Sequence, residues 1–220
     1  MGDRFTLLDE PYYRALCLVS EVLQRAGLDF CLVGGGAAQA WIASLRTDSG
    51  ARSLAEEPRL RSALRKTRDL DFATRVDPAE MLPVLNELAA ETGRDAHVLG
   101  ARAMRLGPVA VSLTLGPEDL SGMSELYDDF LESRAPIRLR REARVDELPT
   151  IGLPELLATK LTRRGDKAKD ILDVTQLLAA LHDAWQTADL ERLRRLVAQR
   201  PDALQLLAEI EQAIEEGEAT

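Results

Sequence analysis

Three consecutive glycines, Gly34, Gly35 and Gly36, separate a short apolar run from an alanine-rich segment, and this change of pattern constrains the fold most. The run before them, residues 30–33, predicts a buried strand, and residues 37–45 predict a helix. Such a turn leaves backbone N–H groups free to face an anion at the start of a helix. It fits the dinucleotide-binding fingerprint poorly, because Gln39 stands where the last glycine belongs, and no phosphate-binding lysine follows.

A second pattern lies downstream, where Asp69 and Asp71 alternate with Leu70 and Phe72. In an extended strand, alternate side chains point to opposite faces, so both carboxylates project to one face and the two apolar side chains to the other. Mg²⁺ prefers oxygen ligands and usually keeps substrate phosphates in its shell. Either pattern alone is unspecific, since glycine turns and acidic strand ends are common. The two together predict a site for a metal–nucleotide complex.

The order of strand, glycine turn, helix and Asp-x-Asp strand resembles the nucleotidyltransferase superfamily with the DNA polymerase β-like fold. The segments that carry the resemblance are VGGGAAQAW and TRDLDF. Two later segments, ELLATKL and KAKDILDVTQLL, are most similar to the AbiEii group, the nucleotidyltransferase toxins of abortive-infection and toxin–antitoxin systems. The resemblance implies an α/β (α+β) class with the nucleotidyltransferase fold, a mixed sheet flanked by helices, and a helical C-terminal lobe. We expect the α/β lobe to span residues 1–148 and the helical lobe residues 149–220.

The resemblance also implies a site for an NTP substrate and its metal ion. Asp69 and Asp71 are the expected catalytic ligands of Mg²⁺ or Mn²⁺. The expected nucleotide-binding residues are Gly34, Gly35, Gly36, Arg68 and Arg164.

The helical half contributes two further candidates. In the AbiEii group a lysine and an aspartate of this half join the active site, and the matching residues here are Lys160 and Asp170. Asp173 is a second candidate for the acid, because the spacing does not separate it from Asp170. A structural salt bridge between two helices is the alternative for these residues.

By the same resemblance, the expected reaction moves an NMP from an NTP to the 3′ end of a tRNA or another RNA, and a cognate antitoxin is the expected protein partner. A small acceptor of the aminoglycoside type, or a protein tyrosine that receives AMP, stays an alternative, because such enzymes share the turn and the Asp pair. A third alternative is a degenerate member of the superfamily that binds a nucleotide or a partner without catalysis. It is favoured because residues 101–115 contain no Asp or Glu, and Ser112 stands where a third carboxylate is expected.

Composition limits the cellular location of the protein and the partners that it can bind. A formal net charge of −9 argues against broad binding along nucleic-acid phosphates, although basic residues gather just before the Asp pair, at Arg65, Lys66 and Arg68. No leader pattern is present, and no apolar run approaches the ~20 residues needed to cross a bilayer. Cys17 and Cys31 lie in apolar runs, as buried free thiols do. We therefore expect a cytoplasmic protein that does not contact the membrane.

Overall fold

The computed structural model describes residues 3–46, 64–116, 127–141, 144–162, 167–181 and 187–216. The chain divides into two compact units, Met1–Ile151 and Gly152–Thr220. The first unit is built on a mixed sheet flanked by helices, and the described part of the second consists of helices. The α/β class and the mixed sheet expected from the sequence are thus confirmed.

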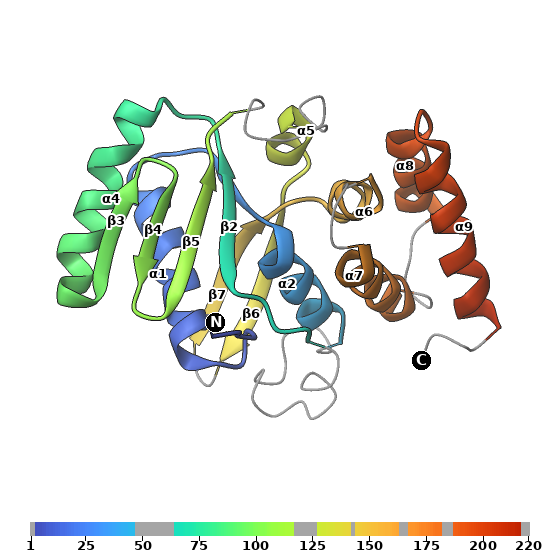
Figure 1. Cartoon of the computed structure of the whole chain (residues 1–220), viewed down its shortest axis with the longest axis horizontal. Helices are drawn as coiled ribbons and strands as arrows, with labels where there is room; N and C mark the ends of the chain where they lie inside the picture. Colours follow the sequence, from blue (N-terminus) through green and yellow to red (C-terminus); the bar gives the residue numbers. More distant parts are fainter. Residues whose placement is uncertain are drawn as a thin grey trace. The chain divides into compact units, whose positions relative to one another are not determined.

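Within the described residues, the sheet of the first unit has seven strands in the order β3-β4-β5-β2-β1-β7-β6 (Figure 1). The strands are β1 Phe30–Val33, β2 Asp69–Thr74, β3 Ala96–Gly100, β4 Ala103–Leu106, β5 Val109–Thr114, β6 Ala135–Arg141 and β7 Arg144–Thr150. β2 lies near the middle, antiparallel to β1 and parallel to β5. The strand that carries the Asp pair is therefore paired on both sides.

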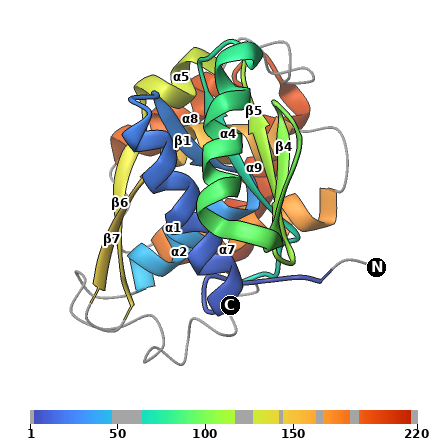
Figure 2. The ribbon, with the colours of Figure 1, turned by 90° about the vertical axis from the view of Figure 1, so that its left-hand side faces the viewer.

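The helices of the first unit cover this sheet. Those in the described residues are α1 Glu10–Arg25, α2 Gly34–Arg46, α4 Pro78–Thr92 and α5 Tyr127–Glu132, with a short 3₁₀ turn η3 Gly93–Asp95 after α4. α1 and α4 pack against each other and against β5, β3 and β4 on one side of the sheet (Figures 1 and 2). α4 starts as its sequence predicts, because the Asp77 side chain accepts a hydrogen bond of 2.7 Å from the N–H of Ala79 and Pro78 occupies the first turn.

The alternation in β2 has the predicted result. Leu70 and Phe72 are fully buried, whereas Asp69 and Asp71 are partly exposed. The neighbouring strand β5 alternates in the same way, with Val111 and Leu113 buried and Ser112 half-buried between them. One face of these strands therefore belongs to the core, and the carboxylates project from the other.

One strand is not predicted by its own sequence. β6 lies at one edge of the sheet. The chain then turns back as β7, which inserts between β6 and β1. The segment RVDELPT lacks a continuous apolar run and contains Pro149, so its local pattern does not indicate a strand. Its long antiparallel pairing with β6 decides its conformation instead.

The second unit contains the helices α6 Leu153–Thr162, α7 Lys167–Leu181, α8 Thr187–Val197 and α9 Pro201–Glu215. α6 packs against the other three, and its apolar side chains are buried. This is the helical arrangement that the sequence predicts for the C-terminal lobe. Across the described parts of the chain, no helix combines the length and the apolar character that spanning a bilayer requires.

Candidate functional site

The glycine turn and the Asp pair meet in the first unit. β1 ends at Val33, which pairs with Asp71 of β2, and α2 begins at the next residue, Gly34. Gly34 has a φ of +65°, and a Cβ placed on it would lie 2.5 Å from Oδ2 of Asp71. A side chain at this position is excluded by both the backbone conformation and the carboxylate. The Asp71 carboxylate thus lies directly against the backbone of the turn.

The next two glycines are approached by other side chains. A Cβ on Gly35 would lie 2.8 Å from Oγ1 of Thr67 and 3.4 Å from Nη2 of Arg65. A Cβ on Gly36 would lie 3.1 Å from the hydroxyl oxygen of Tyr12. The first turn of α2 therefore has a guanidinium group beside it, where the helix N-terminus favours an anion.

Asp69 is held by two neighbours. Its Oδ1 accepts a hydrogen bond of 3.1 Å from Oγ1 of Thr67, and its backbone carbonyl accepts one of 3.1 Å from the hydroxyl of Tyr12. Burial raises the pKa of Tyr12 well above its usual value, and the negative charges of Asp71 and Asp69 raise it further. Tyr12 therefore remains a neutral donor beneath the two carboxylates.

Gln39 joins the segments that flank the site. Its buried amide nitrogen donates to the carbonyls of Arg65 and Phe5, at 3.0 and 3.3 Å. Its Oε1 accepts a hydrogen bond of 2.7 Å from the N–H of Leu7. Gln39, which departs from the dinucleotide fingerprint, thus anchors the segment of Phe5 and Leu7 and the segment of Arg65 to α2. The sequence did not reveal this role of Gln39 or the hydrogen bond from Tyr12 to Asp69. For Gln39, the one available signal was a polar side chain within the apolar face of a helix.

Ser112 occupies the expected place of a third carboxylate. It pairs with Asp71 in the parallel register of β2 and β5, and directly paired residues project to the same face. Within the described ranges, no three His, Cys, Asp or Glu side chains gather closely enough to hold a metal ion. The carboxylate face therefore offers Asp69 and Asp71 as charged oxygen ligands, with a hydroxyl group beside them.

In the second unit, the candidates Lys160 and Asp170 lie close together. Nζ of Lys160 is 2.6 Å from Oδ2 of Asp173 and 3.6 Å from Oδ1 of Asp170, and all three side chains are buried. Asp173 is thus the direct partner of Lys160 in an ion pair between α6 and α7. Arg68 is exposed just before Asp69, and Arg164 lies outside the described residues.

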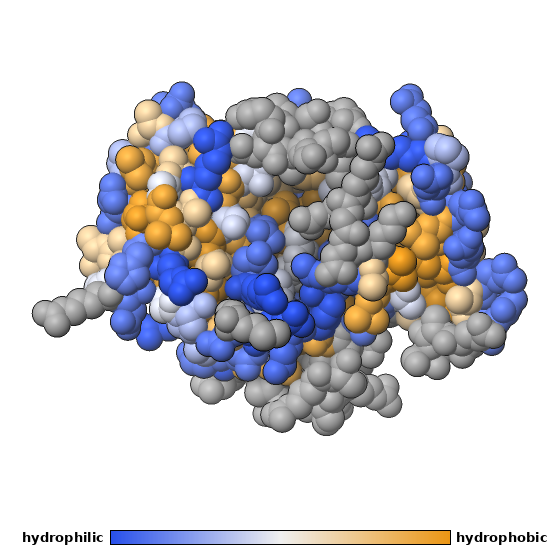
Figure 3. Space-filling model, viewed as in Figure 1, coloured by the Kyte–Doolittle hydropathy of each residue, from blue (hydrophilic) through white to orange (hydrophobic). Residues whose placement is uncertain are grey.

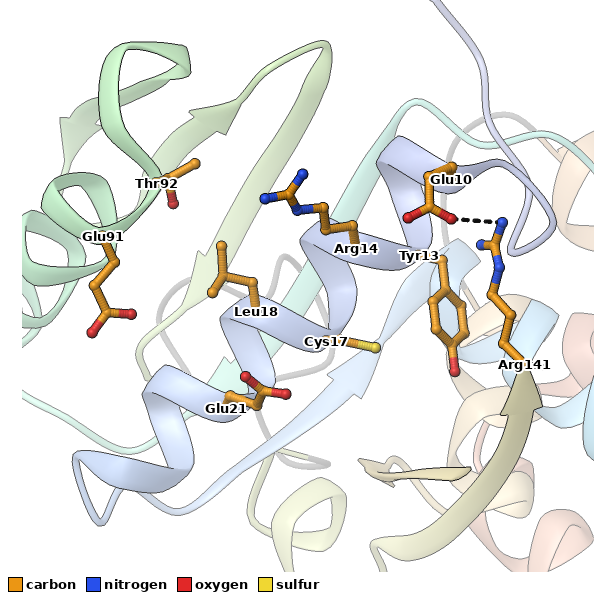
Figure 4. Close-up of a pocket in the computed structure, with 9 residues that line it drawn as sticks. All are labelled: Glu10, Tyr13, Arg14, Cys17, Leu18, Glu21, Glu91, Thr92 and Arg141. Carbon is orange, nitrogen blue, oxygen red and sulfur yellow. Dashed lines mark ion pairs between the residues drawn. The ribbon is translucent and has the colours of Figure 1, made fainter. Parts of the chain in front are cut away.

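A cleft of about 620 Å³ in the described part of the first unit is formed by other residues (Figure 4). It is lined by Glu10, Tyr13, Arg14, Cys17, Leu18, Glu21, Glu91, Thr92 and Arg141. Arg141 stacks on the Tyr13 ring and forms an ion pair of 2.7 Å with Glu10, and the Tyr13 hydroxyl donates to Asp146. These contacts join α1 to β6 and β7, and none of the predicted site residues lines the cleft.

Comparison with known proteins identifies the fold. No protein-family model and no curated protein matches the sequence. An antigenic nucleotidyltransferase-like protein from Paracoccidioides brasiliensis has a similar structure, with a TM-score of 0.52, 15% sequence identity and coverage of 94% of this chain and 95% of that one. The antibiotic-resistance factor ANT(2'')-Ia matches with a TM-score of 0.41, 13% identity and 91% coverage of each chain. The first likeness shows that the chain has the fold of nucleotidyltransferase-like proteins.

Proposed function

We propose that the protein is a nucleotidyltransferase that moves an NMP from an NTP to an acceptor hydroxyl. The observation that carries the proposal is the contact between the Asp71 carboxylate and the Gly34 turn at the start of α2. A phosphate bound at the turn and a cation bound at the carboxylate would be neighbours there. The nucleotidyltransferase-like fold supports the same interpretation.

The residues present fit a hard cation. Asp69 and Asp71 are partly exposed, lie two residues apart on one strand face and supply charged oxygens, which are the ligands Mg²⁺ and Mn²⁺ take. A bound ion would neutralise charge that develops on the phosphates. Gly34 leaves the space that a carboxylate beside a phosphate needs, since a Cβ would fill it.

The other residues of the site have roles that follow from their positions. The N–H groups at the start of α2 would face a bound phosphate, and the Arg65 guanidinium beside Gly35 would neutralise its charge. Tyr12 and Thr67 fix Asp69 through its carbonyl and its carboxylate. Asp69 is thereby held in place before a substrate arrives, which is the basis of electrostatic catalysis.

In the proposed step, the acceptor hydroxyl oxygen forms a bond to the α-phosphorus, and the bond from that phosphorus to the β-phosphate oxygen breaks. Pyrophosphate leaves, and the hydroxyl proton passes to a base. We assign Asp170 to that base or to positioning the acceptor, and Lys160 to phosphate neutralisation. Both assignments rest on the resemblance of ELLATKL and KAKDILDVTQLL to the AbiEii group. Asp173 is then the structural partner of Lys160.

The proposed acceptor is an RNA 3′ end, with tRNA as the first choice, and the proposed role is that of a cytoplasmic toxin controlled by a cognate antitoxin. Two alternatives have an observation in their favour. The net charge of −9 favours a small cationic acceptor of the aminoglycoside type. Ser112 in place of a third carboxylate favours a member that binds a nucleotide without catalysis.

Transfer of label from each NTP into total RNA, in the presence of Mg²⁺, tests the proposal. We expect incorporation by the native protein and a loss of at least a hundredfold in Asp71→Asn. Asp202→Asn, which removes an exposed carboxylate at the start of α9, is the matched control and should keep full activity. Absence of incorporation into RNA, protein or aminoglycoside, or equal incorporation by Asp71→Asn, would contradict the proposal.

A further inference from the structure

The N-terminal segment, residues 5–7, lies against the two residues that hold Asp69. Phe5 and Thr67 form an isolated antiparallel bridge, in which the N–H of each residue donates to the carbonyl of the other, at 2.6 and 2.8 Å. The Phe5 ring stacks on the ring of Tyr12, with 6.1 Å between the ring centroids and 18° between the ring planes. The segment therefore contacts Thr67 through its main chain and Tyr12 through a side chain.

The N-terminal segment is also fastened to α2. Oε1 of Gln39 accepts a hydrogen bond of 2.7 Å from the N–H of Leu7, and the nitrogen of the same side chain donates to the carbonyl of Phe5 at 3.3 Å. Phe5, Leu7 and Gln39 are all buried. In the space-filling view, the described surface where β2 begins is strongly hydrophilic, and the apolar side chains of the segment contribute little to it (Figure 3). The segment thus supports the site from inside rather than presenting an apolar surface to solvent.

Thr67 and Tyr12 connect this support to Asp69. The Thr67 hydroxyl donates to Oδ1 of Asp69 and the Tyr12 hydroxyl donates to the Asp69 carbonyl, both at 3.1 Å. A carboxylate that accepts such a hydrogen bond is held in one orientation, and the loss of a partner of this kind typically lowers metal affinity about 10- to 100-fold. Each of the two contacts of Phe5 therefore ends, one residue further on, at the same proposed metal ligand.

We propose that Phe5 is a positioning residue of the metal site, which acts on Asp69 through Thr67 and Tyr12. Without the stacked ring of Phe5, Tyr12 and the bridge to Thr67 would be held less tightly, and the Asp69 carboxylate would lose its fixed orientation. The coupling is reciprocal by linkage, so a cation bound at Asp69 stabilises the docked N-terminal segment. The inference rests on the proposed function, since it concerns a metal ligand of that site, and it makes metal affinity depend on a segment that precedes α1.

The far end of β2 carries a similar arrangement that serves as a control. Phe130 packs on Tyr127, with ring centroids 6.4 Å apart, and the Tyr127 hydroxyl donates to the carbonyl of Thr74. Phe130 is buried as Phe5 is, but its tyrosine contacts the end of β2 that lies away from the Asp pair. A change at Phe130 therefore disturbs the same strand and the same kind of ring contact at the opposite end.

The test measures the affinity for Mn²⁺, read from the electron paramagnetic resonance signal of the free ion. The proteins compared are the native chain, Phe5→Leu and Phe130→Leu, because leucine keeps each position apolar and removes the ring. We expect Phe5→Leu to weaken Mn²⁺ binding about tenfold and Phe130→Leu to stay within about twofold of the native protein. Thermal unfolding should show a cooperative transition for both variants.

Two further measurements follow the connection itself. Thr67→Val keeps the shape of the side chain and removes the hydroxyl, so it should weaken Mn²⁺ binding as Phe5→Leu does, and Thr67→Ser should restore it. With Mg²⁺ at about ten times its Kd, hydrogen exchange of the Phe5 and Leu7 amides should slow several-fold in the native protein, because the ion favours the docked segment.

The outcomes separate this inference from the proposed function. Native Mn²⁺ affinity in Phe5→Leu, or equal weakening by Phe130→Leu, overturns the positioning role and leaves the proposed function intact. Amide exchange at Phe5 and Leu7 that does not respond to Mg²⁺ also overturns it. No Mn²⁺ binding by the native protein, either alone or with an NTP, contradicts the proposed metal site and this inference with it.

Discussion

Oδ2 of Asp71 lies 2.5 Å from the position that a Cβ of Gly34 would take. The two residues are 37 positions apart in the sequence, and the antiparallel pairing of Val33 with Asp71 brings them together. The first turn of α2 and the acidic strand thus form one continuous surface. Any change that separates them should affect nucleotide binding before it affects the rest of the fold.

Gly34→Ala tests this contact. The substitution places a Cβ against the carboxylate and imposes a positive φ on alanine, so we expect a loss of stability and of Mg–NTP binding. Gly27→Ala is a matched control, because Gly27 has a φ of +68° and a Cβ added there would have no neighbouring atom within 4 Å. It should show only the cost of the left-handed conformation, about 1–2 kcal/mol. Urea unfolding and calorimetry measure the two effects, and equal effects of the two variants would refute the role of the contact.

Gln39→Ala should destabilise the first unit. The substitution removes a buried amide that bonds to Leu7, Phe5 and Arg65, and it leaves those backbone groups without this partner. We expect a loss of about 2–3 kcal/mol in the free energy of unfolding. Gln205→Ala removes an exposed amide that bonds to Glu209 within α9, and it should change stability by less than about 0.5 kcal/mol. Similar values for the two variants would show that the buried amide is dispensable.

Asp173→Asn and Asp170→Asn should differ in what they impair. Asp173 is the 2.6 Å partner of Lys160 in a buried ion pair, so its replacement should cost about 3–5 kcal/mol of stability. Asp170 lies 3.6 Å from the same ammonium group, and its replacement should cost less than half as much while abolishing transfer. Thermal unfolding and the transfer assay together separate the two acids. An inactive but stable Asp173→Asn would reverse the assignment.

The stability of the protein should fall at alkaline pH because of Cys31. Burial raises the pKa of its thiol from 9.0 to about 12. Between these values the unfolded chain releases a proton that the folded chain keeps, so the stability contributed by the neutral thiol is lost as the pH rises. The stability difference between the native protein and Cys31→Ala should shrink by about 1.4 kcal/mol per pH unit above about pH 9. A difference that stays constant from about pH 8 to about pH 10.5 would contradict this.

Local patterns predicted those features that depend on neighbouring residues. The alternation from Asp69 to Phe72, the cap at Asp77 and the strand-to-helix change at Gly34 each follow from a few consecutive residues. Their conformations follow from the spacing of apolar residues and from the backbone preferences of single residues, and the sequence shows both directly. The same holds for the helices of the second unit.

The meeting of the glycine turn with the Asp pair was expected from the two patterns together, but other contacts between distant segments were not predicted. Tyr12 reaches Asp69 from α1, and Phe5 of the N-terminal segment pairs with Thr67. β7 takes its conformation from β6 rather than from its own composition. The residues next to them in the sequence do not indicate which distant residues they contact. The direct pairing of Lys160 with Asp173 rather than with Asp170 also depends on distances that the sequence does not show.

Equilibrium dialysis of labelled NTPs tests whether the Gly34 turn and the Asp pair form one metal-dependent nucleotide site, on which the proposed function depends. We predict that the native protein retains at least one NTP with Mg²⁺ and releases it with EDTA. We also predict that Asp71→Asn loses retention and that Asp202→Asn keeps it. Retention of none of the four NTPs, or retention that neither EDTA nor Asp71→Asn reduces, would contradict a metal–nucleotide site at this turn.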